Sequence, residues 1–163
     1  MRPHHEGQPV IEHPNRHKAS SKTTRVVVFA LLIASMVLMG LVLIGGWDAL
    51  SGMQFVTIAW IIVYGIFAWY IVKWNRGVLP VIAALGILML IFGLIAMPAW
   101  FDRDSTGFAE TSIPAGVLGT LCAILIAVQA LLIFFAMQGF RQAWNVEVEH
   151  YPAEEPDYVP LGV

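Results

Sequence analysis

Four long apolar runs alternate with short polar segments along the chain. They are Val26–Ile44, Phe55–Val72, Val78–Met97 and Ile113–Met137, and none of them contains Asp, Glu, Lys, Arg or His. At a rise of about 1.5 Å per residue, runs of this length match a hydrocarbon core of about 30 Å. Lipid offers no hydrogen-bond partner to the backbone, so each run must be a helix. The pattern predicts an all-α transmembrane bundle of four antiparallel helices, at about 26–46, 54–74, 78–97 and 113–138.

Prolines and flanking residues refine these boundaries. Pro80 and Pro114 fall in the first turns of the third and fourth helices, where a missing N–H costs nothing. Pro98 is expected to close the third helix. The first run is too long for a signal-peptide core and no A-x-A site follows it, so we expect a retained helix.

The segments outside the transmembrane domain (26–137) are polar and contain several prolines. Residues 1–25 form a basic arm, and residues 138–163 form an acidic tail containing Pro152, Pro156 and Pro160. Composition of this kind predicts disorder in both segments. The sequence around Tyr151 and Tyr158 in the tail also suits docking onto a cytoplasmic partner.

Basic residues predict the orientation of the helices. Of the nine Lys and Arg residues, only Arg103 lies in the segments between the first and second or the third and fourth helices. Short basic segments stay in the cytoplasm, so we expect both termini there and the protein in the cell (plasma or inner) membrane. Trp47 and Trp100 at one level, and Trp69, Trp74 and Trp144 at the other, fit two interfacial belts.

Composition supports a membrane location and excludes some partners. Hydrophobic residues make up 58% of the 163 residues and charged residues only 12%. A soluble domain of this size could not bury so much apolar surface. A net charge of −2 gives no indication of a nucleic-acid partner. Cys122 is the single cysteine, so an intrachain disulfide is excluded.

Small residues recur every four positions on the fourth helix, at Ala115, Gly119, Ala123 and Ala127. Helices in lipid associate through close backbone contact at small residues. We therefore expect this face to pack on another helix and the Leu-rich opposite face to meet lipid. Gly86 and Gly93 on the third helix are the natural counterpart within the chain, although a partner in another subunit remains open.

Gln129 is the strongest polar group inside the predicted membrane segments. It lies near the middle of the fourth helix, at the border of the small-residue face. An amide at this depth usually forms a hydrogen bond between helices. We expect that role for Gln129 rather than substrate binding.

Two short motifs resemble chemical sites. The loop sequence Asp102–Gly107 matches the start of a calcium loop, but Ile113 occupies the position that needs a bidentate Glu. The same string resembles the D-x-D-x-T nucleophile motif of haloacid-dehalogenase-type phosphatases, for which so short a loop cannot supply the α/β domain. The arm also contains His4, His5, His13 and His17, and Pro14 is expected to prevent a helix from placing the last two on one face. We expect no metal site, cofactor or catalytic residue.

The sequence therefore predicts a protein that works by association. No carboxylate or histidine lies at membrane depth, which argues against an enzyme or an active carrier. The expected role is an accessory or scaffold subunit in the lipid bilayer, bound to another membrane protein or to copies of itself. The alternative is a small passive channel or carrier for a neutral or apolar solute, lined by Tyr64, Thr57 and Gln129.

Overall fold

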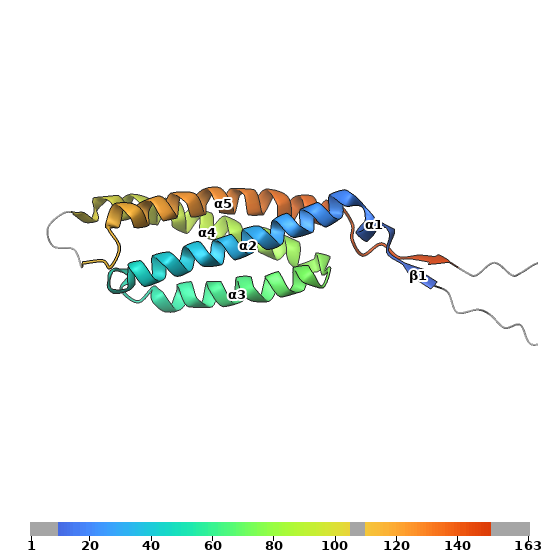
Figure 1. Cartoon of the computed structure of the whole chain (residues 1–163), viewed down its shortest axis with the longest axis horizontal. Coiled ribbons are helices and arrows are strands. Elements are labelled where there is room, and N and C mark those ends of the chain that lie inside the picture. The colour runs from blue at the N-terminus through green and yellow to red at the C-terminus, as the bar shows by residue number, and fades with distance from the viewer. Residues whose placement is uncertain (1–9, 105–109, 151–163) are drawn as a thin grey trace, which may run out of the picture.

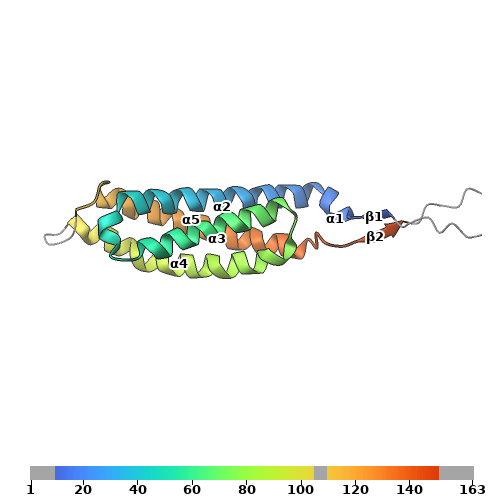
Figure 2. The same cartoon turned by 90° about the horizontal axis from the view of Figure 1, so that it is seen from below.

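Four long helices lie side by side and make up most of the molecule (Figures 1 and 2). The structure is a computed structural model that describes residues 10–104 and 110–150. The long helices are α2 (Ala19–Gly45), α3 (Gln54–Val72), α4 (Leu79–Phe101) and α5 (Ala115–Arg141). Each is long and apolar enough to cross a membrane. The predicted all-α transmembrane bundle is therefore confirmed.

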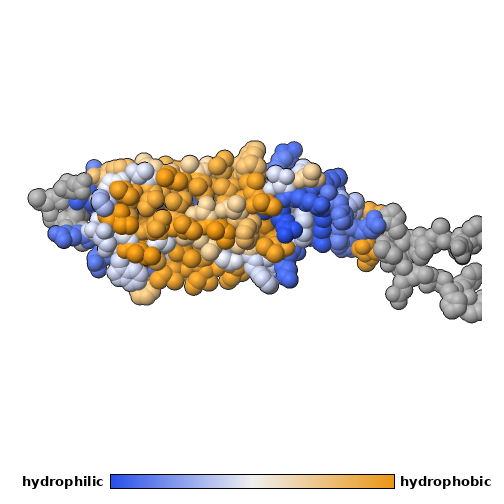
Figure 3. Space-filling model, in the orientation of Figure 1, coloured by the Kyte–Doolittle hydropathy of each residue, from blue (hydrophilic) through white to orange (hydrophobic). Residues whose placement is uncertain are grey.

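The bundle has two distinct ends. The tail end is where the segments before α2 and after α5 lie, and the loop end is opposite to it (Figure 1). The short tail-end elements are β1 (Val10–Glu12), α1 (Pro14–His17), η2 (Arg76–Val78) and β2 (Val148–His150), and those of the loop end are η1 (Trp47–Leu50) and η3 (Asp102–Asp104). On the face shown in Figure 3, apolar side chains form a belt across the helices, with hydrophilic residues beyond it at both ends.

Helix packing closes three sides of the bundle and leaves the fourth more open. Helix α4 packs along α5, α5 along α2, and α2 along α3. Helices α3 and α4 have little close contact with each other along their lengths. They are joined at the tail end by η2, so any separation between them is greatest toward the loop end.

Two helix boundaries differ from those expected. Helix α2 begins at Ala19, seven residues before the expected Val26, because its polar first turns pack on the segment after α5. There Gln142 Nε2 donates to Thr24 Oγ1 at 2.9 Å. Helix α4 continues through Pro98 to Phe101 rather than ending at Met97. A proline is tolerated inside a membrane helix where neighbouring groups satisfy the freed carbonyl.

Parts of both tails have regular structure. Strands β1 and β2 pair antiparallel, with Val10 opposite His150 and Glu12 opposite Val148. The described parts of the arm and tail therefore differ from the disorder expected from composition. The parts that lie outside the described residues include His4, His5, Tyr151 and Tyr158.

Two adjacent glycines fix the loop end. The Gly45 carbonyl oxygen accepts a hydrogen bond from Ser112 N at 2.9 Å, which holds the start of α5 against the end of α2. A Cβ on Gly45 would lie 2.6 Å from Ile113, and one on Gly46 would overlap the Trp100 ring. The Gly45–Gly46 pair is thus required by close approach of α4 and α5 at this end.

Candidate functional site

Three polar side chains from three helices meet in the middle of the bundle. The Tyr64 hydroxyl on α3 donates to Gln129 Oε1 on α5 at 2.9 Å, and Gln129 Nε2 donates to Ser35 Oγ on α2 at 2.9 Å. Ser35 Oγ in turn donates to the Leu31 carbonyl at 2.8 Å. All three side chains are 0% exposed. The interhelical bond expected for Gln129 is present and ties α5 to two helices at once. We call these three residues the polar centre.

Gly86 and Gly93 lie where α4 meets α5, but their nearest neighbours are not the small residues of the Ala115–Ala127 stripe. Each glycine receives a large side chain of α5 rather than a small one. A Cβ on Gly86 would lie 3.0 Å from Ile133, and a Cβ on Gly93 would lie 2.8 Å from Ile126. The two glycines and the two isoleucines are each seven residues apart, which is the spacing of knobs-into-holes packing.

The small-residue stripe of α5 packs over only part of its length. Ala115 and Gly119 are buried, and Gly119 meets the Phe101 ring, but Ala123 is half-buried and Ala127 is exposed. A four-residue repeat rotates by about 40° per step around an α-helix, so the stripe turns away from its neighbours. The face that is buried repeats every seven residues instead, and comprises Leu118, Cys122, Leu125, Gln129, Leu132 and Ala136. The expectation that the leucines face lipid was therefore wrong for Leu118, Leu125 and Leu132.

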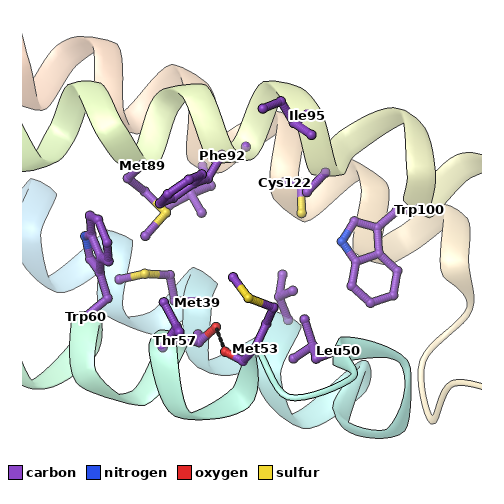
Figure 4. Close-up of a pocket in the computed structure, with 15 residues that line it drawn as sticks. Met39, Leu50, Met53, Thr57, Trp60, Met89, Phe92, Ile95, Trp100 and Cys122 are labelled. Atoms are coloured by element: carbon purple, nitrogen blue, oxygen red, sulfur yellow. Dashed lines mark hydrogen bonds between the residues drawn. The ribbon is translucent and has the colours of Figure 1, made fainter.

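A cavity of about 280 Å³ lies in the loop-end half of the bundle. We call it the loop-half pocket. All four long helices and η1 contribute to its lining, which includes Met39, Leu50, Met53, Trp60, Met89, Phe92, Trp100 and Cys122 (Figure 4). The Trp60 and Phe92 rings, both in the lining, meet edge to face with their centroids 5.9 Å apart and link α3 to α4.

The pocket offers few polar groups to a ligand. Thr57 Oγ1, the hydroxyl in its wall, already donates to the Met53 carbonyl at 3.0 Å (Figure 4). The Cys122 thiol is a weak hydrogen-bond donor. Trp60 Nε1 is buried and has no hydrogen-bond partner among the described residues. The chemistry of the pocket therefore suits an apolar occupant.

Trp144, just after α5, anchors the tail end. Its side chain is 0% exposed, and its ring stands edge to face with Trp74 at a centroid distance of 5.5 Å. Trp144 Nε1 donates to Gln142 Oε1 at 3.0 Å, and its carbonyl accepts from Arg16 Nε at 3.2 Å. The amino-terminal arm is thus joined to the segment after α5 through a buried tryptophan, which hydrophobic periodicity does not reveal.

At two turns of the tail end, a residue other than glycine adopts the left-handed backbone conformation. Trp74 has φ 59° and Ala143 has φ 50°. Such values are uncommon for residues other than glycine and are maintained by surrounding contacts. Here the Arg25 guanidinium lies 4.4 Å from the Trp74 ring, and Asn15 Nδ2 donates to the Ala143 carbonyl at 3.0 Å. The two turns are therefore held by residues of the amino-terminal arm and α2.

A cleft of about 680 Å³ opens beside this anchor. Its lining residues are Ile11, Glu12, His13, Arg16, His17, Lys22 and Trp74. We call it the basic cleft, because cationic side chains outnumber the single carboxylate in its wall. Among the described residues, no group of three or more His, Cys, Asp or Glu side chains could hold a metal ion. Residues 105–109 of the loop that resembles calcium and phosphatase motifs lie outside the described part of the chain.

The fold and these sites define a multi-pass membrane protein. Comparison with protein-family models, with curated proteins and with solved structures finds no match to the chain. The functional interpretation therefore depends on the residues themselves.

Proposed function

We propose that this chain is a non-catalytic membrane protein that works by association, as an accessory or scaffold subunit of a larger assembly in the cell membrane. The observation that carries the proposal is the tail end, where the two tails pair and leave a solvent-facing cleft. A bundle that needed only to fold in lipid would not require this anchored extension. The partner is either another membrane protein or a second copy of the chain.

The basic cleft supports a partner with an acidic and apolar segment. Ile11 is an exposed aliphatic residue beyond the helical belt, beside Arg16 and Lys22. Charged side chains in such a surface steer a partner of opposite charge and determine its register. Strands β1 and β2 form a two-stranded sheet, so in the described part of the chain each has one edge available for strand addition.

Orientation is part of the proposal. Arg16, Lys22, Arg25, Lys73, Arg76 and Arg141 belong to the tail-end segments, whereas Arg103 belongs to a loop-end segment. The positive-inside rule then favours a cytoplasmic tail end. Ser20→Cys and Ser51→Cys are matched probes of the two ends in a Cys122→Ala background. An impermeant maleimide added to intact cells should label Ser51→Cys alone, and labelling of Ser20→Cys instead would reverse the orientation.

A central pore fits the structure less well. Tyr64 and Gln129 are fully buried and hydrogen-bonded to each other, so they block a path along the bundle axis. Thr57 lines the loop-half pocket, where its hydroxyl donates to the Met53 carbonyl. The passive channel considered from the sequence therefore lacks a supporting observation in a single copy of the chain.

Crosslinking followed by purification in mild detergent tests the association. The full chain should crosslink to a stoichiometric partner or to itself. The double variant Ile11→Ser, Lys22→Ser changes the basic cleft and should reduce that product. The control Val146→Ser, Lys18→Ser changes two exposed residues outside the cleft and should leave it intact. A chain that crosslinks to nothing, or equal products from both variants, would contradict the proposal.

A further inference from the structure

We propose that the loop-half pocket binds one acyl chain of a bilayer phospholipid, which enters sideways between α3 and α4 from the leaflet at the loop end. This inference does not depend on the association proposed above. It rests on the position of the pocket's mouth, on the chemistry of its walls, and on a fixed positive charge at its interfacial end.

The mouth of the pocket opens toward the bilayer. Four lining residues are substantially exposed: Met53 (48%) just before α3, Val56 (41%) on α3, and Phe92 (45%) and Ile95 (70%) on α4. Three of them lie on the two helices that have little close contact with each other, and Met53 immediately precedes one of these helices. The opening therefore lies on the side of the bundle that faces lipid, between α3 and α4.

The floor of the pocket is apolar and adaptable. Val42, Trp100, Cys122 and Leu125 are nearly fully buried and belong to α2, α4 and α5. Methionines from α2, from α4 and from the turn before α3, namely Met39, Met89 and Met53, line the walls (Figure 4). Unbranched thioether side chains adjust to irregular apolar ligands. The lining therefore suits a flexible chain better than a rigid ring system.

The volume matches part of an alkyl chain. At about 280 Å³ the pocket is larger than an engineered apolar cavity of about 150 Å³ that accepts benzene, and it lies at the lower limit for drug-sized ligands. Water does not fill apolar cavities of this kind. An empty pocket would deprive its lining of dispersion contacts on one side. In the membrane, the molecules available to restore those contacts are lipid chains.

A positive charge at the interfacial end favours a phospholipid over a free hydrocarbon. The Arg103 guanidinium lies 4.7 Å from the centre of the Trp100 ring, and its Nη2 donates to the Ala49 carbonyl at 2.9 Å. These contacts place the guanidinium against Trp100, whose ring lines the pocket. Arginine is well suited to the phosphate group of a lipid whose chain occupies the pocket.

Photo-crosslinking in vesicles tests this assignment. The full chain is reconstituted with phosphatidylcholine carrying a diazirine on one acyl chain, and crosslinked peptides are mapped by mass spectrometry. Ala96→Phe places a ring in the pocket wall, whereas Ala84→Phe places the same ring on the exposed face of the same helix, outside the pocket. A parallel sample receives a free diazirine fatty acid in unlabelled phosphatidylcholine.

The expected result is enrichment of phospholipid crosslinks at Met53–Trp60 and Met89–Trp100 over the remaining lipid-facing surface. Ala84→Phe should keep this enrichment and Ala96→Phe should lose it, with helix content unchanged in both. Crosslinks spread evenly over the bundle, or equal patterns for the two variants, would overturn the inference. Enrichment with the free fatty acid alone would overturn the assignment to a phospholipid.

Discussion

The tail-end half and the loop-end half of the bundle are built from the same four apolar helices but are held together differently. From the polar centre toward the tail end, hydrogen bonds and aromatic contacts join the helices, as at Trp144 and between Arg76 Nε and the Phe140 carbonyl at 2.7 Å. Toward the loop end, α3 is separated from α4 by the loop-half pocket. In lipid, the hydrophobic effect does not bring helices together. Polar contacts between the helices can therefore decide which half of the bundle packs more tightly.

The comparison predicts that the largest loss of stability comes from the tail-end anchor. Trp144→Ala should lower the free energy of unfolding by about 3 kcal/mol, because a buried ring is replaced by a cavity. Trp47→Ala, at an exposed loop-end tryptophan, is the matched control and should have little effect. Unfolding in mixed detergent micelles, followed by circular dichroism, measures both. Similar losses for the two variants would show that the tail end has no special role.

Breaking the polar centre should have the next largest effect. Gln129→Leu removes the hydrogen bonds to Tyr64 and Ser35, and hydrogen bonds between membrane helices are worth about 0.6 to 1.7 kcal/mol each. Gln138→Leu, the same change at an exposed position of α5, should be close to neutral. In the same unfolding assay, Tyr64→Phe should cost less in the Gln129→Leu background than in the original chain. Additive losses would mean that the two side chains are not coupled.

Glycine substitutions compare the packing of the two halves directly. Gly86→Ala and Gly93→Ala should each destabilise by about 1 kcal/mol, because the added methyl group meets Ile133 or Ile126. Gly40→Ala should stabilise by up to about 1 kcal/mol, since nothing lies within 4 Å and alanine favours the helix. A Cβ at Gly93 would have the closer contact, at 2.8 Å against 3.0 Å at Gly86. Because Gly93 lies in the less tightly packed loop-end half, Gly93→Ala should nevertheless lower the free energy of unfolding by less than Gly86→Ala. Thermal unfolding of the three variants ranks them.

The smallest expected effect is on the reactivity of Cys122. Its thiol is buried in the loop-half pocket, so a charged maleimide should react with it far more slowly than with a cysteine placed at the exposed position Ser51. A small membrane-soluble maleimide should reach Cys122 through the opening between α3 and α4. Ala96→Phe should slow that reaction and Ala84→Phe should not. Equal rates with both reagents in the original chain would show that the pocket is open to water.

The transmembrane fold could be predicted from sequence because its cause is local. Four uncharged runs of sufficient length must be helices in lipid, whichever way they pack. Gln129 could also be singled out, since an amide at membrane depth needs a partner. The identity of its partners could not be predicted, because Tyr64 and Ser35 depend on the rotation of two other helices.

The remaining features depend on tertiary packing. The four-residue stripe from Ala115 to Ala127 suggested a packing face, but the buried face follows the seven-residue spacing of Leu118, Leu125 and Leu132. Pro98 reads as a stop signal, yet α4 continues past it. Trp144 looked like an interfacial residue, and its burial requires both tails to meet. The loop-half pocket has no sequence signal, because it depends on how far apart α3 and α4 pack.

The polar centre also has a consequence for biosynthesis. Its central amide belongs to α5, which leaves the ribosome after α2 and α3, while the hydroxyl groups that it bridges enter the membrane with those earlier helices. Until α5 is inserted, Tyr64 and Ser35 lack their common partner, although Ser35 can bond to its own helix through the Leu31 carbonyl. Insertion of α5 therefore completes the polar centre, and a nascent chain cut short before it would leave a phenol in need of a hydrogen bond for quality-control proteases to recognise.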